Sequence, residues 1–494
     1  MDHKKGTYHS ILKATSIFGG VQVFSILITI IRGKFVAILL GTAGMGLNGL
    51  FMSGINLIKS LTSLGIPESA VKELSVAYSS GDEQKMAQTF SVFRNWIWFT
   101  ACLGLVITLI FASTLSISAF GDDSQTTAFR WLSINFVFTA LTGGVYTYLR
   151  GTRQIKHLAK ATVLGSFFGL LTSIPLFYWL GKEGVVPSIV VSAATTYLIS
   201  LYFARKVQIP KAKLTFKQTF DLGKPMVLLG LNLSMSTLLG FLVTYVLSAF
   251  IVQKGNLSDL GLYNAGVTII TGYVGMVFTA IGTDYYPRLA GLVHDESKWK
   301  GLVQQQGELV LIILGVVVLI LMVSVQILIK VLLSDEFLTS ADYIMWSVFA
   351  LPLKGIVWVQ GFVLIAKGEN KIFLTTEIIS NATMLILNLV FYSWLGLTGL
   401  GISMVISYIS AQLMMVIVLK RYFNFSLSWD VYKLLLVIFV FMAGIMLVHL
   451  QNPAFGIWIK LGTAMLGSLY LGWELHKKIN LTETFSTVLA KFKK

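Results

Sequence analysis

Fourteen long apolar runs follow one another along the chain, and no other feature of the sequence constrains its fold as strongly. The first six lie near 11–40, 46–66, 92–114, 127–149, 158–180 and 184–204, and eight more lie near 225–252, 259–283, 307–333, 341–366, 372–394, 398–419, 431–449 and 456–475. A bilayer core about 30 Å thick needs about 20 apolar residues per helix. The runs are continuous, whereas the strands of a transmembrane β-barrel would alternate between apolar and polar residues. We therefore predict an all-α polytopic membrane protein with about fourteen transmembrane helices.

The composition excludes several protein classes. Of the 494 residues, 55% are hydrophobic and 12% are charged, whereas a soluble chain carries roughly 25% charged residues. The chain is therefore not an ordinary soluble enzyme, a disordered chain or a disulfide scaffold. Its single cysteine, Cys102, lies in an apolar run, its six histidines have no metal-ligand spacing, and it has no glycine-rich phosphate loop. We predict that it is not an enzyme and that it holds no metal and no cofactor.

The distribution of lysine and arginine predicts the orientation. With the N-terminus in the cytoplasm, the cytoplasmic segments hold 29 of the 38 basic residues and the external loops hold five. Cytoplasmic loops of membrane proteins carry such an excess, so both termini are expected in the cytoplasm. The formal charge of +16 is spread over short loops and forms no single patch. No nucleic-acid partner is therefore expected.

The chain matches itself at one fixed offset of 215 residues, with the apolar runs in phase. The matching residues are Gly46-Leu47 with Gly261-Leu262, Trp179-Leu180-Gly181 with Trp394-Leu395-Gly396, and Ser188 with Ser403. Because each repeat holds an even number of spans, both start on the same side of the membrane. We predict an N-lobe over 1–205, a cytoplasmic linker over 206–224 and a C-lobe over 225–421. Residues 422–494 would add two helices and a basic cytoplasmic tail.

Three lysines, Lys34, Lys59 and Lys354, lie inside apolar runs that contain almost no compensating acids. A charge at a helix centre costs about 2.5–3.5 kcal/mol on insertion scales. Each lysine could snorkel to the membrane surface, but we predict that all three line a cationic central cavity for an anionic substrate. Weaker candidates for this cavity are Arg32, Asn56, Tyr146 and Gln360. Arg32 and Lys34 lie about 200° apart around a helix and cannot both face it; Lys34 is the preferred ligand.

Two stretches resemble a known family. Gly33–Ala37 leads into Leu40–Leu47, and this pattern resembles the end of the first span and the first external turn of bacterial polysaccharide flippases. Those proteins are the O-antigen and enterobacterial-common-antigen translocases of the multidrug/oligosaccharidyl-lipid/polysaccharide (MOP) exporter superfamily. Leu260–Ala265 and Tyr285–Leu289 resemble the matching part of that family's second lobe. Lys34 corresponds to a lysine in the family's Gly-Lys pattern.

The resemblance implies a function. The substrate would be an oligosaccharide repeat unit of O-antigen or a related surface polysaccharide, linked to undecaprenyl pyrophosphate. The chain would flip it by alternating access from the cytoplasmic to the periplasmic leaflet of the bacterial inner membrane. The implied partners are membrane lipid, a coupling H⁺ or Na⁺, and the polymerase and chain-length proteins of the glycan pathway. Because the expected cavity lies within one chain, a functional monomer is expected.

Three alternatives stay open. A multidrug exporter of the same superfamily would carry organic cations, but that mechanism generally needs a buried carboxylate, and the first six spans have none at their centres. A lipid II flippase of the peptidoglycan pathway would share the fourteen spans and the basic cavity. A non-transporting scaffold of a glycan-assembly complex would tolerate neutralised cavity lysines, whereas a flippase would not.

Overall fold

A computed structural model describes residues 2–207, 212–451 and 456–478. Within these ranges the regular elements are helices and no strand occurs. The α-helices are α1 (Asp2–Thr62), α2 (Ile66–Ser79), α3 (Glu83–Ile110), α4 (Ala112–Phe120), α5 (Thr126–Gly151), α6 (Ile155–Leu180), α7 (Val185–Ala204), α8 (Phe216–Lys254), α9 (Leu257–Leu292), α10 (Glu296–Leu332), α11 (Ala341–Val348), α12 (Ala350–Ala366), α13 (Asn370–Phe423), α14 (Trp429–Gln451) and α15 (Ile457–Lys478). Two short 3₁₀ helices, η1 (Gly181–Gly184) and η2 (Asp335–Ser340), precede α7 and α11.

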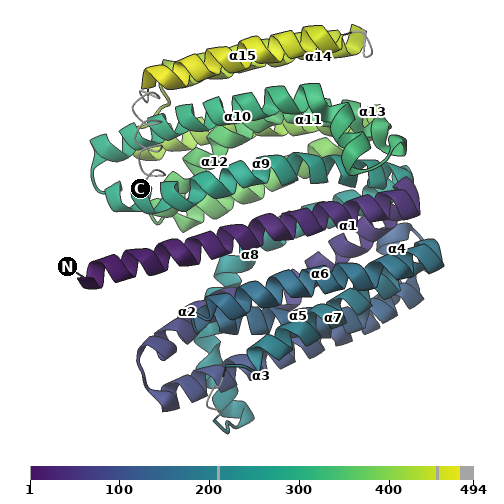
Figure 1. The fold of residues 1–494 in the computed structure, drawn as a ribbon, viewed down its shortest axis with the longest axis vertical. Helices are drawn as coiled ribbons and strands as arrows, with labels where there is room; N and C mark the ends of the chain where they lie inside the picture. Colours follow the sequence, from purple (N-terminus) through teal and green to yellow (C-terminus); the bar gives the residue numbers. More distant parts are fainter. Residues whose placement is uncertain (1, 208–211, 452–455, 479–494) are drawn as a thin grey trace. The chain divides into compact units, whose positions relative to one another are not determined.

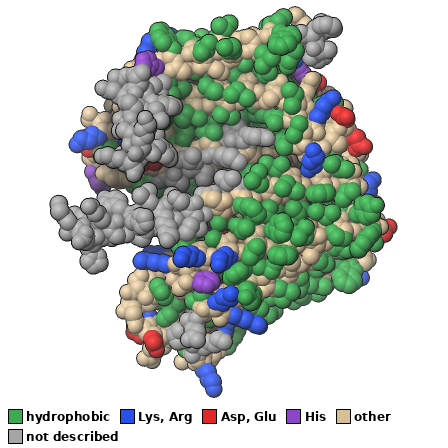
Figure 2. All heavy atoms as spheres, viewed as in Figure 1, with side chains coloured by type: hydrophobic (Ala, Val, Ile, Leu, Met, Phe, Trp, Pro, Cys, Tyr) green, Lys and Arg blue, Asp and Glu red, His purple; other side chains and the backbone are tan. Residues whose placement is uncertain are grey.

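In the described part of the chain, eight helical stretches are long and apolar enough to cross a membrane, and the pair from η2 to α12, bent by 45°, makes a ninth if it forms one span. Three of the eight stretches contain a break, at Gly41, Gly181 and Gly396, and each is long enough for two crossings. The helices α9 and α15, which are 36 and 22 residues long, have the length for one crossing each. These lengths are compatible with the predicted number of about fourteen spans. Figure 2 shows that hydrophobic side chains cover much of the visible surface.

Two pairs of residues that match at the offset of 215 have the same local structure. Gly181 and Gly396 both break a helix with a positive φ, at φ/ψ of 55/−131° and 58/−140°. A residue with a Cβ atom rarely adopts such values. The Ser188 hydroxyl donates to the carbonyl of Val185 at 2.7 Å, and the Ser403 hydroxyl donates to the carbonyl of Leu400 at 2.9 Å. The parallel repeat is therefore visible in the backbone as well as in the sequence.

One contact joins a residue to its own repeat partner. A Cβ atom on Gly46 would lie 1.8 Å from the carbonyl oxygen of Leu257, and one on Gly261 would lie 1.9 Å from the carbonyl oxygen of Thr42. Thr42 and Leu257 are themselves related by the offset of 215. Each glycine therefore approaches the residue four positions before its own repeat partner, so the contact is reciprocal. Only glycine allows the two backbones to approach this closely.

The chain divides into two compact units, Met1–Gly261 with Leu332–Ser334 (unit 1) and Leu262–Val331 with Asp335–Lys494 (unit 2). In unit 1, a buried apolar cluster joins α2, α3, α5, α6 and α7 through Leu74, Phe93, Leu149, Leu158 and Phe203. The helix α8 packs against α1, α2 and α3 within this unit. The repeat assigns α8 to the C-lobe, so unit 1 extends further than the N-lobe, and the lobe boundaries stay a prediction.

In unit 2, α10 contacts the two helices that follow the repeat. A Cβ atom on Gly315 of α10 would lie 2.6 Å from Leu471 of α15 and 3.0 Å from Ile438 of α14. Figure 1 shows α14 and α15 side by side, and they are in direct contact. These two helices therefore pack onto the rest of unit 2 through an apolar interface.

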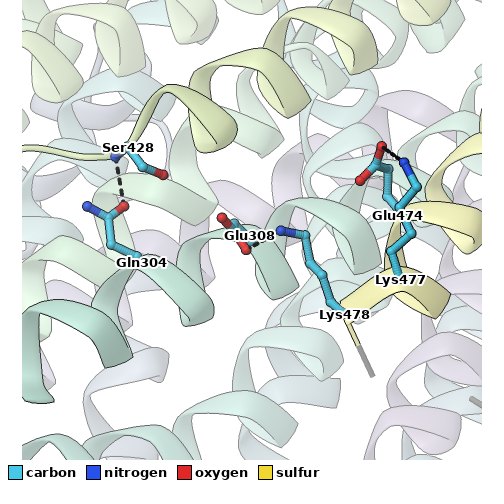
Figure 3. Close-up of polar contacts among 6 residues, drawn as sticks. All are labelled: Gln304, Glu308, Ser428, Glu474, Lys477 and Lys478. Carbon is cyan, nitrogen blue, oxygen red and sulfur yellow. Dashed lines mark hydrogen bonds and ion pairs between the residues drawn. The ribbon is translucent and has the colours of Figure 1, made fainter. Parts of the chain in front are cut away.

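Polar contacts hold α14 and α15 at both ends. At one end, the Lys478 ammonium lies 2.6 Å from a Glu308 carboxylate oxygen, and the side-chain Oε1 of Gln304 accepts from the backbone N–H of Ser428 at 2.8 Å (Figure 3). At the other end, Lys460 Nζ lies 3.3 Å from His449 Nδ1, and His449 Nε2 lies 2.9 Å from Asp342 of α11. The pair is therefore fixed to α10 at one end and to α11 at the other.

Candidate functional site

A cavity of about 290 Å³ in unit 1 brings together four of the sequence-predicted site residues. We call it the Lys59 cavity. Its polar lining residues are Arg32, Asn56, Lys59, Asn135, Thr139, Thr142, Tyr146, Ser192 and Thr196. The Lys59 side chain is exposed in the cavity, and Arg32 is half-buried. The cavity is therefore lined by four predicted candidates, Arg32, Asn56, Lys59 and Tyr146.

Helical periodicity explains how the cavity is built. In the second half of α1, Met52, Asn56 and Lys59 recur at intervals of three and four residues and so lie on one face. In α5, polar residues recur in the same way over 135–146 and form a stripe inside an otherwise apolar helix. Ser192 and Thr196 continue this polar surface on α7. Three segments thus turn their polar stripes towards one space.

Three threonine hydroxyl groups in the Lys59 cavity donate to backbone carbonyls and can accept hydrogen bonds from a ligand. Thr139 Oγ1 donates to the carbonyl of Asn135 at 2.9 Å, Thr142 Oγ1 donates to Phe138 at 2.8 Å, and Thr196 Oγ1 donates to Gly165 at 3.1 Å. Their protons point to the backbone, so their lone pairs are left for a ligand that donates hydrogen bonds. Arg32 and Lys59 supply only donors and positive charge. The cavity can therefore bind hydroxyl groups and an anion together.

The charge of this cavity is positive. Its described lining includes two cations and no carboxylate. A cation inside a membrane is costly unless water, a partner or an anion compensates it. A smaller cavity of about 30 Å³, lined by Thr62, Ser63 and Thr100, also reaches Lys59. The arrangement therefore favours an anionic ligand.

Lys34 does not line this cavity, although Arg32 does. The half-buried Lys34 side chain lies on another face of α1, as the angle of about 200° between the two positions requires. The two cations are therefore separated as expected, but the one in the Lys59 cavity is Arg32. A role for Lys34 in binding stays a prediction.

Lys354 lies in unit 2, near the start of α12 and just after the bend between α11 and α12. Its ammonium is 5.8 Å from the ring centroid of Phe278 and 6.0 Å from that of Tyr408. A row of aromatic rings continues from this point along α9 and α12. Ring centroids are 5.2 Å apart for Phe278–Trp358, 4.8 Å for Trp358–Phe362 and 5.5 Å for Phe362–Tyr286.

The repeat relates Lys354 to the Lys59 cavity. At the offset of 215, Lys354 corresponds to Thr139, which lines that cavity.

Gln360, the remaining candidate, is 1% exposed, and its Oε1 has no hydrogen-bond partner among the described residues. It is packed in the interior of unit 2, six residues and hence about 240° from Lys354 around the helix. Gln360 is therefore not brought to the same surface as Lys354.

Sequence reasoning missed the polar stripe of α5 and the aromatic row of unit 2. Asn135, Thr139 and Thr142 carry the stripe, and their spacing of four and three residues was the available signal. The aromatic row has no comparable signal, because it combines residues of α9 and α12 that are about 80 positions apart. Among the residues that the structure describes, no group of three His, Cys, Asp or Glu side chains could hold a metal ion.

Comparisons with known proteins agree with this architecture. A family model described as "Polysaccharide biosynthesis protein" matches residues 35–342. The chain is similar to the Lipid III flippase of Escherichia coli (strain K12), with 23% identity over 376 residues that cover 74% of this chain and 86% of that protein. The same identity and coverage hold for the Lipid III flippase of Shigella flexneri.

Two solved structures share the fold. The lipid II flippase MurJ in its inward closed conformation superposes with a TM-score of 0.69 at 14% identity, over 94% of this chain and 99% of that one. An inward-facing multidrug resistance MATE transporter of the MOP superfamily also has a TM-score of 0.69, at 15% identity, over 83% of this chain and 95% of that one. At such identities these likenesses show the fold alone. The chain shares the fold of these two transporters, and it belongs to the polysaccharide biosynthesis protein family.

Proposed function

We propose that the chain is a flippase for an undecaprenyl-pyrophosphate-linked oligosaccharide repeat unit, of O-antigen or a related surface polysaccharide. It moves this substrate from the cytoplasmic to the periplasmic leaflet of a bacterial inner membrane by alternating access, with both termini in the cytoplasm. The observation that carries the proposal is the lining of the Lys59 cavity, which combines cations with hydroxyl acceptors and contains no carboxylate among its described residues. Family membership and the Lipid III flippase relatives support the substrate class.

The chemistry of the substrate fits this lining. A pyrophosphate carries negative charge and accepts charge-assisted hydrogen bonds, which Arg32 and Lys59 donate. The sugars present hydroxyl groups, which donate to the free lone pairs of Thr139, Thr142 and Thr196. The isoprenoid tail stays in the hydrocarbon of the bilayer and needs no site of its own.

Unit 2 offers a second set of contacts with the same chemistry. Lys354 supplies a positive charge, and the partly exposed rings of Trp358, Phe362 and Tyr286 supply flat apolar faces. Such faces pack against the apolar side of a sugar ring. We propose Lys354 as a second phosphate contact and the aromatic row as a sugar contact.

Reconstitution into liposomes tests the proposal. The labelled substrate is an undecaprenyl-pyrophosphate oligosaccharide, and the signal is the label that becomes accessible in the opposite leaflet. Lys59→Gln should slow translocation about tenfold, because one charge-assisted hydrogen bond is lost. Lys254→Gln removes an exposed lysine outside the cavity and should behave as the unmodified chain does.

The alternatives are outcomes of the same assay. Crossing of lipid II in preference to the oligosaccharide lipid would make the chain a lipid II flippase. Expulsion of a cationic dye without lipid crossing would make it a multidrug exporter. An imposed proton or sodium gradient that accelerates crossing would identify the coupling ion. Unchanged crossing by Lys59→Gln would refute a role for the Lys59 cavity.

A further inference from the structure

Unit 1 contains another, larger cavity, of about 920 Å³, that shares no lining residue with the Lys59 cavity. We call it the α3–α7 cleft. Its floor is α5, through Leu141, Gly144 and Tyr148, and its walls are α3 and α7, each of which packs on α5. Leu141 and Tyr148 are buried, at 9% and 3% exposure. The cleft is therefore a groove between two helices with an apolar base.

The two helices that form the walls of the α3–α7 cleft carry exposed apolar side chains. Trp98, which lines the cleft, is 48% exposed. Outside the lining, Phe99 of α3 is 46% exposed, and Leu198 and Tyr202 of α7 are 61% and 59% exposed. Large apolar side chains that are exposed on membrane-spanning helices contact acyl chains, because the hydrocarbon is their favourable environment. An apolar groove that opens between such helices fills with lipid chains and not with water.

Two arginines line the same cleft. Arg94 lies about 16 Å along α3 from its first residue, and Arg205 directly follows α7. Within the described residues, neither guanidinium takes part in an ion pair. One carboxylate, Glu83, also lines the cleft, so its net charge is about +1 at neutral pH. A half-buried arginine in a membrane span is costly without an anion or water beside it.

We propose that the α3–α7 cleft binds an anionic phospholipid. Its phosphate would pair with Arg94 and Arg205, and one acyl chain would lie along the floor formed by Leu141 and Tyr148. A guanidinium binds a phosphate through two parallel hydrogen bonds, and Trp98 has the amphipathic ring typical of the membrane interface. Phosphatidylcholine also carries a phosphate, but its choline neutralises the headgroup, so the net charge of the lipid decides the preference. This site does not depend on the proposed substrate.

Native mass spectrometry of the full chain in detergent tests the site with phosphatidylglycerol and phosphatidylcholine of identical acyl chains. The unmodified chain should retain phosphatidylglycerol in preference to phosphatidylcholine. Arg94→Gln should lower that preference about five- to tenfold, and Arg205→Gln should lower it in the same direction. Glu83→Gln should raise it, because the one carboxylate in the lining is removed. Arg130→Gln is the matched control, since Arg130 is exposed and lies outside the cleft.

A second measurement places the lipid. Brominated phosphatidylglycerol quenches nearby tryptophans, and the difference between the unmodified chain and Trp98→Phe isolates the signal of Trp98. That signal should be quenched more strongly by brominated phosphatidylglycerol than by brominated phosphatidylcholine, and Arg205→Gln should remove the difference. Equal retention of the two lipids by the unmodified chain would overturn the proposal. An equal effect of Arg94→Gln and Arg130→Gln would overturn it too.

Discussion

Replacement of His449 by phenylalanine is expected to destabilise unit 2, whereas replacement of its neighbour Lys460 by methionine is not. Lys460 and His449 are 4% and 6% exposed, and their side-chain nitrogens lie 3.3 Å apart. An ammonium group can only donate a hydrogen bond, so His449 Nδ1 accepts it. The proton of the neutral ring is then on Nε2, which donates to Asp342 at 2.9 Å. The ring is thus the acceptor for a buried charge.

The magnitude follows from burial. Removal of one partner of a fully buried ion pair costs about 3–5 kcal/mol. The side chain of Asp342 is 59% exposed, so its contact with His449 is screened by solvent and contributes about 0–1 kcal/mol. Lys460 lies in the first turn of α15, where its long stem can move the charge towards water. We therefore expect His449→Phe to lower the free energy of unfolding by about 2–3 kcal/mol, mostly because the Lys460 ammonium would be left without its acceptor.

The opposite substitution removes the charge itself. In Lys460→Met, an apolar side chain of similar length fills the same space, and such replacements of buried charges are neutral or stabilising by about 1–4 kcal/mol. The double variant should recover most of the stability lost in His449→Phe, because it has no Lys460 ammonium that needs an acceptor. The two residues are in contact, so their effects should not add.

Thermal unfolding in detergent, followed by intrinsic fluorescence, measures these differences. For about 150–250 residues a loss of 1 kcal/mol lowers the midpoint by about 2–4 °C, so His449→Phe should lower it by about 4–12 °C. Lys460→Met should leave it unchanged or raise it. Equal losses in both single variants would refute the reasoning, since they would show that the ammonium itself contributes stability.

Two further predictions concern the repeat and unit 2. Gly261→Ala should lower the free energy of unfolding by about 1–3 kcal/mol, because the new Cβ atom would lie 1.9 Å from the carbonyl oxygen of Thr42. Thermal unfolding would detect this loss. Gly301→Ala is the control and should cause no loss, because a Cβ atom there would have nothing within 4 Å. Lys354→Gln should slow translocation of the labelled oligosaccharide lipid in liposomes about tenfold through the loss of one phosphate contact. A rate equal to that of Lys254→Gln would exclude Lys354 from the transport path.

Hydropathy and self-similarity were sufficient to predict the architecture. The length of the apolar runs predicts about fourteen crossings, and the offset of 215 pairs Gly181 with Gly396, at both of which the structure has a helix break. Lys59, Asn56 and Tyr146 could be predicted as neighbours of one cavity because polar groups in a membrane interior turn away from lipid. The spans, the repeat and the polar positions within the spans can all be identified from the order of residue types along the chain.

The rotation of each helix about its axis could not be predicted in the same way. Periodicity separates Arg32 from Lys34, but which of them faces the Lys59 cavity depends on how α1 packs against α5 and α7. The burial of Gln360 could not be predicted for the same reason, since an amide in an apolar run is equally compatible with a cavity wall and with a packed interior; its role in binding stays a prediction. The packing of α8 in unit 1 depends on contacts that hydropathy does not encode, such as the hydrogen bond from Trp96 to the carbonyl of Thr219.

The contact between Gly46 and Gly261 is reciprocal. In a two-fold symmetric dimer, residue i meets residue j while j meets i, and Thr42 with Gly261 and Leu257 with Gly46 obey the same rule within one chain. Two identical segments would also carry every charge twice. Here Arg32, Lys59 and Lys354 correspond to Leu247, Val274 and Thr139, so the repeat keeps this close backbone contact but not these charges.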